Sequence, residues 1–451
     1  MKVILKLLFL FIISTPLFGS NENTAADYVA AGDSLLQIGN LDEAKDKFKD
    51  ALGKDKKNIN ARFGLGRIKI EEEEWADAND EFEKVLDIDP QNKLAHYYRG
   101  ICYRENGKFK VLLQRKWEWN RSKKHFFAVM EQDSAFRDVL LQYAILLQYR
   151  HKFDKAIHTA HRQIRLRPDL VEPQIRIFRI YQYFIFQDVD RDLINLENTL
   201  SSSEIIDWLE KQTYDHARFM IAEKYRSMDE YTQAVTVLND MLQTPLSMPR
   251  QAIYLSLARI YYARLHAEKA ESYFWRAVDE MDDDVEAGIV FQDVKYILTD
   301  QEYAEYQSSK TIEQKKAFFR HLWAKRNPTP IAAINYRLSE HYHRLLYAEE
   351  NYTYRGFRSR FSQVDRMGYI HYPASYKLNE EFNDKGLIYI RHGKPDEQVV
   401  TQGRAVPVNE SWMYYETATS PKMIFHFTPE RESKYWRFTP IIENQQMIRE
   451  R

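Results

Sequence analysis

The side chains best suited to chemistry lie near the C-terminus, where Arg391, His392 and Gly393 directly follow a short apolar run. An imidazole beside a guanidinium can attack a phosphate group that the guanidinium holds. Such a site needs a further arginine and a second histidine from a long α/β segment. Only about sixty residues follow here, and His426 is the one histidine among them. A strand ending in a Gly-Lys-Pro turn, with Arg391 and Asp384 pairing across it, is the simpler interpretation.

Elsewhere the sequence lacks the spacing of a catalytic or metal site. His341 and His343 are two apart on an expected helix, and residues two apart on a helix do not share a face. The sequence contains no HExxH zinc motif and no GxxxxGK[ST] phosphate loop, and its single cysteine, Cys102, excludes a paired-cysteine site. We therefore predict no catalytic residue, no bound metal and no cofactor.

The elements that must position any site repeat at a fixed distance. Small and aromatic residues recur after thirty-four positions, first at Gly32, Ala44, Phe48 and Ala51 and then at Gly66, Ala78, Phe82 and Val85. Two antiparallel helices approach closely only where side chains are small, and large rings fill the space between neighbouring pairs. This pattern resembles the tetratricopeptide repeat, which implies a superhelix of stacked helical hairpins.

Further units follow in the same register, marked by Ala144, Phe153 and Ala156, by Ala222, Tyr225 and Ala234, and by Ala258, Ala270 and Phe274. One unit departs from the period, because Ser122, Phe126 and Val129 come about ten residues late. The segment from Leu112 to Arg121 is therefore an expected insertion, and it carries Trp117 and Trp119. Residues 171–214 are also about ten residues too long. We predict seven units over about 25–284.

Beyond residue 284 the period lapses. A helical pattern continues over 285–306. A second helix is expected after a capping box formed by Thr311 and Gln314, and a third from Ile331 to about Asn351. Short aromatic or branched runs then predict strands at Leu387 to Arg391, Ser411 to Tyr415, Met423 to Phe427 and Tyr435 to Phe438. We expect these strands to form a mostly antiparallel sheet packed on the preceding helices.

A specific motif lies in this tail, after an aromatic helix and a Pro-Thr-Pro break at 328–330. It runs from Asp384 to Glu397, and its marked positions are Asp384, Gly386, Tyr389, Arg391, Gly393, Pro395 and Asp396. Residues 311–430 resemble the GWxTD domain of bacterial exported proteins, which often accompanies tetratricopeptide repeats. The name-giving Gly-Trp-x-Thr-Asp is here Glu380-Glu381-Phe382-Asn383-Asp384, so only the aspartate matches. The resemblance implies an architecture and export, but no chemistry.

The first twenty residues predict a secretory signal peptide. Lys2 and Lys6 precede an apolar run from Leu7 to Ile13, which is too short to span a bilayer, and small residues follow up to Ser20. An uncleaved N-terminal anchor is the competing interpretation. Lysine and arginine (65) nearly balance aspartate and glutamate (66), so nothing points to a nucleic-acid partner. We expect a periplasmic or extracellular protein with no integral membrane segment after signal removal.

A partner surface is expected on the first helix of each repeat, which lines the concave face of such a solenoid. Aromatic residues stand beside arginines at its outward positions, which include Phe63, Arg67, Tyr97, Arg104, Tyr149, Arg259 and Tyr262. Rings and guanidinium groups at successive steps suit an extended protein or peptide partner that bears carboxylates.

The predicted protein is mainly α, with a signal peptide over 1–20, a solenoid with trailing helices over 21–310 and a GWxTD-like α+β domain over 311–451. Its predicted function is that of an exported scaffold or adaptor that uses the concave face of its repeats to hold a protein or peptide partner. An envelope complex is the expected setting. The alternative is an extracytoplasmic hydrolase with a site near Arg391 and Asp396. A purely structural envelope component is a third interpretation.

We expect export to remove the leader by cleavage after Gly19 or Ser20. N-terminal sequencing of the chain recovered from the periplasm or the medium should then begin at Ser20 or Asn21. Recovery of a chain that still carries the apolar run from Leu7 to Ile13 would establish the N-terminal anchor in its place.

Overall fold

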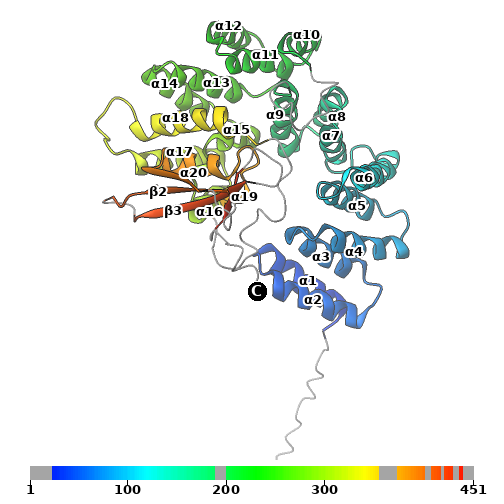
Figure 1. The fold of residues 1–451 in the computed structure, drawn as a ribbon. Helices are drawn as coiled ribbons and strands as arrows, with labels where there is room; N and C mark the ends of the chain where they lie inside the picture. Colours follow the sequence, from blue (N-terminus) through cyan, green and yellow to red (C-terminus); the bar gives the residue numbers. More distant parts are fainter. Residues whose placement is uncertain are drawn as a thin grey trace, which may run out of the picture. The chain divides into compact units, whose positions relative to one another are not determined.

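The computed structural model describes residues 23–187, 200–354, 373–401, 408–417, 421–429 and 436–439. The chain divides into two compact units, residues 1–132 and residues 133–451. Most of the described residues are helical (Figure 1). The predicted signal peptide lies outside the described residues and stays a prediction, as do the three domain boundaries.

The first unit consists of three helical hairpins. Their helices are α1 (Ala25–Gln37) with α2 (Leu41–Lys54), α3 (Ile59–Glu71) with α4 (Trp75–Ile88), and α5 (Lys93–Gly107) with α6 (Leu112–Gln132). Asn40, Asn58 and Asn92 each precede a helix, and each side chain accepts a hydrogen bond from the backbone N–H three residues on. These caps satisfy amide groups that would otherwise lack partners, and so they fix where α2, α3 and α5 begin.

Bare glycine backbone lets the helices of this unit approach one another. A Cβ atom on Gly32 of α1 would lie 2.7 Å from the ring of Phe48, and one on Gly64 of α3 would lie 2.3 Å from the same ring. The pairing recurs one and two hairpins later, between Gly66 and Phe82 and between Gly100 and Phe126. All three rings are fully buried. The pairing of small and large residues predicted from the repeat is confirmed.

The predicted insertion lengthens a helix. Helix α6 has 21 residues, whereas α2 and α4 have 14 each. Ser122, Phe126 and Val129 are buried, as the displaced repeat pattern predicts. The inserted residues therefore extend the start of α6 and do not form a loop.

The second unit continues with four more helix pairs. They are α7 (Val139–Tyr149) with α8 (Phe153–Leu166), α9 (Val171–Ile185) with α10 (Ser202–Glu210), α11 (Asp215–Ser227) with α12 (Tyr231–Leu242), and α13 (Arg250–Ala263) with α14 (Ala267–Asp279). Helices α1 to α14 thus make seven pairs, which end just before the predicted limit at residue 284. The predicted fold class, a helical solenoid followed by a small domain with an antiparallel sheet, is confirmed.

Trailing helices connect this array to the tail. They are α15 (Asp284–Val294), the short 3₁₀ helix η2 (Lys295–Ile297), α16 (Asp300–Ser308), α17 (Ile312–Arg326) and α18 (Tyr336–Asn351). The predicted helix over 285–306 is interrupted at η2, and Thr299 then caps α16. The helix predicted from Ile331 begins five residues later, because Asn335 caps it by accepting hydrogen bonds from the backbone N–H groups of Arg337 and Leu338.

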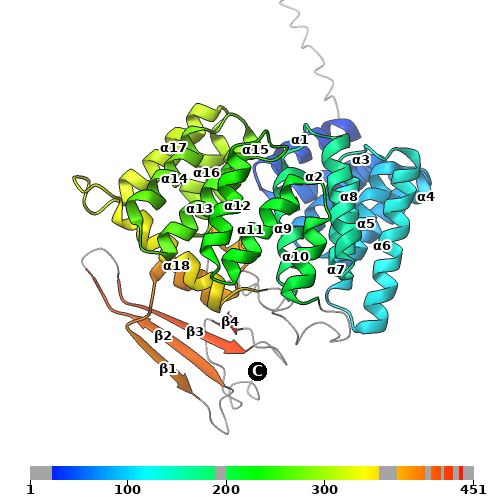
Figure 2. The same ribbon diagram turned by 90° about the horizontal axis from the view of Figure 1, so that it is seen from above.

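The tail packs a small sheet against one helix. Its elements are α19 (Ala374–Lys377), α20 (Asp384–His392), β1 (Glu397–Thr401), β2 (Asn409–Tyr414), β3 (Met423–Pro429) and β4 (Trp436–Thr439). The strands pair antiparallel in the order β1-β2-β3-β4 and lie to one side of α18 (Figure 2). Helix α20 packs between α18 and β4. Trp412, Phe427 and Phe438 are buried on the sheet.

One predicted strand is wrong, and one strand was not predicted. The run from Leu387 to Arg391 lies inside α20, because the Asn383 side chain caps that helix by accepting a hydrogen bond from the Gly386 N–H. A short apolar run does not distinguish a strand from a buried helix. Strand β1 is exposed along its whole length, so it lacks the alternating burial that predicts a strand.

No helix within the described residues is long and apolar enough to cross a membrane.

We expect Gly66→Ala to destabilise the chain by about 1–3 kcal/mol, because the added methyl group would meet the buried ring of Phe82 at 2.5 Å. Alanine has a higher helix propensity than glycine by about 1 kcal/mol, so this substitution would stabilise the helix if there were no clash. A loss of stability would therefore show the steric clash. Gly53 is the matched control, since a Cβ there meets nothing within 4 Å, and Gly53→Ala should be neutral or stabilising. Urea unfolding followed by circular dichroism measures both. A stabilised Gly66→Ala variant would contradict the close approach.

Candidate functional site

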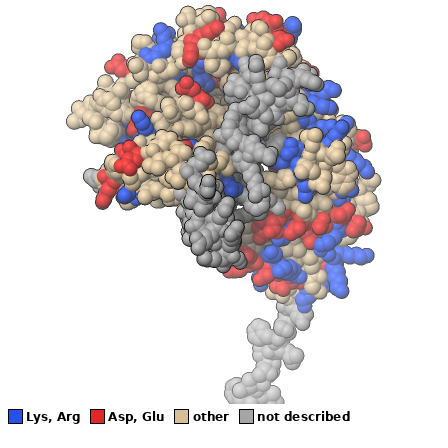
Figure 3. Space-filling view, in the orientation of Figure 1, with Lys and Arg blue, Asp and Glu red and all other residues tan. Residues whose placement is uncertain are grey.

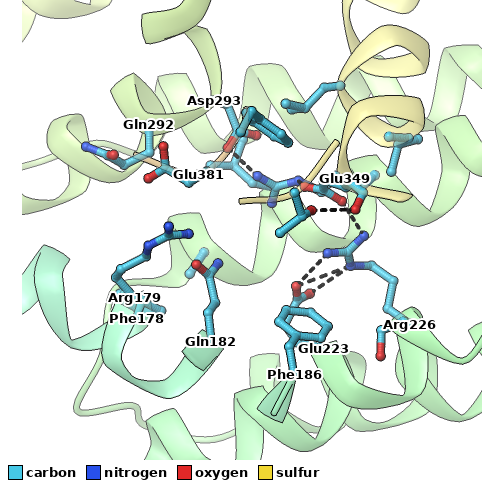
Figure 4. Close-up of a pocket in the computed structure, with 18 of the residues that line it drawn as sticks. Phe178, Arg179, Gln182, Phe186, Glu223, Arg226, Gln292, Asp293, Glu349 and Glu381 are labelled. Atoms are coloured by element: carbon cyan, nitrogen blue, oxygen red, sulfur yellow. Dashed lines mark hydrogen bonds and ion pairs between the residues drawn. The ribbon is translucent and has the colours of Figure 1, made fainter. Parts of the chain in front are cut away.

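A cleft of about 1210 Å³ lies in the second unit. Its walls come from α9, α11 and α13, the first helices of successive pairs, and from α15, α18 and residues 377–383 (Figure 4). Arginine and glutamate side chains share these walls with aromatic rings. The cleft therefore combines charge with apolar surface.

A continuous chain of ion pairs joins four helices along one wall of the cleft (Figure 4). Arg226 of α11 donates to Glu223 of the same helix and to Glu349 of α18, each at 2.9 Å. Arg259 of α13 pairs with Asp293 of α15, and its Nε lies 3.4 Å from Oε1 of Glu349. Glu349 thus links the two arginines and connects α18 to the solenoid.

Burial and the neighbouring arginines shift the pKa values of the carboxyl groups of this wall in opposite directions. Burial alone would raise the pKa of Glu223, but Arg226 and Arg259 hold that pKa below its ordinary value. Burial raises the pKa of Asp293 above its ordinary value, although Arg259 opposes the shift. The Tyr342 hydroxyl donates to Asp293 Oδ2 at 2.8 Å. These carboxyl groups hold the chain's own arginines, so the network acts as a structural wall.

An acidic segment of the tail occupies the opposite part of the cleft. Arg176 of α9 forms an ion pair with Glu380, and its charge holds the Glu380 pKa well below the ordinary range. Lys295 Nζ lies 3.0 Å from Glu381 Oε1, and the Tyr296 hydroxyl donates to Glu381 Oε2 at 2.9 Å. Two adjacent carboxylates of an irregular segment are therefore held by cations from the solenoid side of the cleft.

Arg179 of α9 is incompletely satisfied. Its Nη2 donates to the Glu380 carbonyl at 2.7 Å, and its guanidinium carbon lies 4.9 Å from the ring centre of Tyr183. Its buried Nε has no hydrogen-bond partner among the residues that the structure describes. Phe178, Gln182 and Phe186 line the cleft beside it (Figure 4). This stretch of α9 offers a cation next to aromatic surface.

The predicted groove residues of the first unit are mostly covered. Phe63 and Tyr97 are buried, and Arg104 is 6% exposed and donates to Glu105 at 2.6 Å. The expectation that these three side chains point outward is wrong, because packing of the hairpins covers them. Arg67 is exposed and lies 3.3 Å from Asp33 of α1. A role of any of the four in binding stays a prediction.

The three predicted groove residues of the second unit lie in different environments. Arg259 lines the cleft as part of the ion-pair network. Tyr149 is partly exposed and is not among the residues that line the cleft. Tyr262 has no exposed surface and stacks on Tyr342 at 4.7 Å, so its expected outward orientation is also wrong. It supports α18 from within the core.

Most of the residues that line the cleft are not among those predicted from the sequence. Its principal charged residues are Arg176, Arg179, Arg226, Glu349, Glu380 and Glu381. One signal was available, because Arg176 and Arg179 are three apart and share a face of α9 with aromatic residues. Glu380 and Glu381 stand where the GWxTD motif has Gly-Trp. This departure draws attention to residues 380–381 but does not predict which side chains they contact.

The motif residues of the tail hold α20 in place. Asp384 Oδ2 accepts from the backbone N–H of Phe438 at 2.8 Å, and Tyr389 stacks on Tyr347 at 4.4 Å. A Cβ on Gly386 would lie 2.7 Å from Tyr352. The remaining positions form the turn into β1: Gly393 has a φ of +82°, Pro395 follows, and the backbone N–H of Asp396 donates to the Met413 carbonyl.

The side chains of Arg391 and Asp396 bind groups of the chain itself. Arg391 Nη1 donates to the carbonyls of Tyr296 and Leu298 and to Ser375 Oγ. Asp396 Oδ2 accepts from the backbone N–H of Tyr415 at 2.7 Å. Arg391 thereby joins α20 to η2 and α19. Among the described residues, no three His, Cys, Asp or Glu side chains are grouped so that they could hold a metal ion.

Comparison with known proteins identifies the repeats. Residues 29–92 and 66–110 match the family model of the tetratricopeptide repeat, so this part of the chain carries such repeats, as predicted. No curated protein matches the chain.

Several solved structures are similar to parts of the chain. A tetratricopeptide repeat protein from Parabacteroides merdae is 18% identical, with 60% of this chain and 84% of that chain covered and a TM-score of 0.32. MamA from Desulfovibrio magneticus is 14% identical, with coverage of 47% and 97% and a TM-score of 0.32. YrrB, described as a TPR protein with an unusual peptide-binding site, is 19% identical, with coverage of 36% and 79% and a TM-score of 0.28. TM-scores this low carry no conclusion about function.

We expect Arg226→Ala to destabilise the second unit by about 3–5 kcal/mol, because Glu223 and Glu349 would lose the buried cation that both contact. Arg320→Ala is the matched control, since Arg320 and Asp279 form a pair in which both side chains are about half exposed. Its loss should cost about 0–1 kcal/mol. Urea unfolding compares the two variants. Equal costs would show that the network contributes no more than a surface ion pair.

Proposed function

We propose that this chain is an exported scaffold that holds an extended segment of a protein partner in the cleft of its second unit. The observation that carries the proposal is Arg179, a cation on the cleft wall whose Nε lacks a hydrogen-bond partner among the described residues. A buried donor without a partner costs free energy, and a ligand carboxylate or carbonyl would satisfy it.

The surroundings of Arg179 define the chemistry of the segment. Tyr183 lies beneath the guanidinium, and Phe178 and Phe186 line the same wall. An acidic side chain would form a charge-assisted hydrogen bond with the guanidinium, and an adjacent apolar side chain would pack on the rings. We therefore expect a partner segment in which an acidic residue neighbours an aromatic or aliphatic one.

The chain's own acidic segment supports this choice. Glu380 and Glu381 are held by Arg176, Lys295 and Tyr296 in the neighbouring part of the cleft. The cleft wall thus already binds irregular backbone with adjacent carboxylates. A partner segment would extend this mode of binding along α9 towards Phe186.

The proposal also includes export of the chain and the identity of its C-terminal domain. The leader over 1–20 would direct the chain to the periplasm or the extracellular space, where it would act in an envelope complex. We propose that residues 311–451 are a divergent GWxTD-type domain. Asn383 caps α20 at the position of the motif's threonine, and asparagine and threonine are both favoured helix caps. This equivalence supports the assignment.

Affinity capture from an envelope extract tests the scaffold, with Arg179→Ala as the test variant. One charge-assisted hydrogen bond is worth about 1.5–3 kcal/mol, so the amount of the specific partner should fall by about tenfold to a hundredfold. The matched control is Arg264→Ala, because Arg264 is exposed, lies in the same unit and does not line the cleft. Quantitative mass spectrometry compares the captures, and circular dichroism checks the fold. A partner that Arg179→Ala retains in full would place the binding surface elsewhere.

A further inference from the structure

The inserted start of α6 forms a surface that the proposed peptide cleft leaves unused. The Trp119 indole N–H donates to the Arg104 carbonyl at 3.1 Å, and Trp119 also covers Gly107, the last residue of α5. Residues before Trp119 in α6 therefore extend past the end of α5. The insertion that the repeat pattern predicted is thus a projecting helix start.

Exposed apolar side chains concentrate on this projection. The exposed fractions are 70% for Val111, 79% for Leu112, 81% for Leu113 and 52% for Trp117, and Phe127, further along α6, is 37% exposed. Single exposed apolar residues are ordinary on protein surfaces, but a contiguous apolar patch marks an interaction site. Three of these side chains are consecutive, and Trp117 lies one turn beyond Leu113 on the same side of the helix.

The same helix carries a local excess of positive charge, although the whole chain has a net charge of −1. Helix α6 contains five lysines and arginines and two acids, Glu131 and the buried Glu118. At 3.6 residues per turn, the cations share one broad exposed face with the apolar side chains. The exposed cations of that face are Lys116, Arg121, Lys123 and Lys124. Lysine and arginine side chains gather over α6 in Figure 3.

Cations and rings are paired on this face. The guanidinium of Arg121 lies 3.5 Å from the ring centre of Trp117, and Lys123 Nζ lies 5.0 Å from the ring centre of Phe127. Tryptophan and basic side chains both favour the interface between lipid headgroups and acyl chains, where a ring is half buried and a cation meets phosphate. The face matches that interface in charge and in polarity.

We propose that the projecting start of α6 docks this protein on an anionic lipid surface. The lysines and Arg121 contact lipid phosphates, while Val111, Leu112, Leu113 and Trp117 enter the headgroup layer. A soluble polyanion would satisfy the cations but would leave the three aliphatic side chains in water. A lipid surface, which is anionic outside and apolar beneath, uses both features.

Vesicle co-sedimentation tests the proposal with the chain from residue 21 onwards, which keeps every described residue. Vesicles of equal parts phosphatidylglycerol and phosphatidylcholine should bind it, and pure phosphatidylcholine should bind it at least about tenfold more weakly. The combined variant K116Q/K123Q/K124Q should bind the anionic vesicles roughly a hundredfold more weakly, at about fivefold per lysine. L112S/L113S should lose about tenfold or more, because it removes apolar area and no charge.

Matched controls separate this surface from general charge and hydrophobicity. K49Q/K56Q/K57Q removes three cations from the same unit, Ile38→Ser removes an apolar side chain that is 77% exposed, and both should bind like the parent. Arg179→Ala should also bind vesicles normally, since the cleft is a separate site. Equal binding to both vesicle types would overturn the proposal. So would a soluble polyanion that binds the parent and L112S/L113S equally while neither binds vesicles.

Discussion

Packing of a phenyl ring directly against glycine backbone is the contact on which the first unit depends. The ring of Phe48 fills the space that a side chain on Gly32 or on Gly64 would occupy, so it joins its own hairpin to the next. Phe82 and Phe126 repeat the contact with Gly66 and Gly100. In the second unit, Ala222 and Ala258 take the place of these glycines, and both are fully buried. Each pair of helices can bury its apolar face only by stacking in this way, and the array follows from that requirement.

Stacking also places charges in register. Arg67 pairs with Asp33 in the first unit and Arg259 pairs with Asp293 in the second, and both pairs are separated by thirty-four residues. Helix α15 therefore occupies the position of a next repeat, although its own sequence no longer shows the pattern. In the second unit this register brings Arg226 and Arg259 to one wall, where Glu349 contacts both. Buried ion pairs are weak sources of stability, so we regard this network chiefly as a device that fixes α18 on the solenoid.

The tail is integrated into the second unit by polar contacts at both ends of its motif. Glu380 and Glu381 contact α9 and η2, while Arg391 donates to carbonyls of η2 and the loop that follows it. The tail therefore helps to build the cleft that the proposed partner would use. The projecting start of α6 belongs to the other unit and combines apolar and basic residues. Under the two proposals, one unit anchors the protein to lipid and the other holds a partner segment.

The amino-acid sequence determined the repeat array, its seven units and the insertion in α6, because small and aromatic residues recur at a fixed local period and Phe126 comes about ten residues late. It also determined that a mostly antiparallel sheet follows the helices, through short branched and aromatic runs. Only the tertiary structure decided that Leu387 to Arg391 is helical, since the Asn383 cap and the contacts of α20 override an ambiguous apolar run. It alone assembled the cleft, because Arg176 and Glu380 are 204 residues apart and no local pattern links them. Packing likewise decided that Tyr262 is core, as its stacking partner Tyr342 comes from a helix outside the repeat.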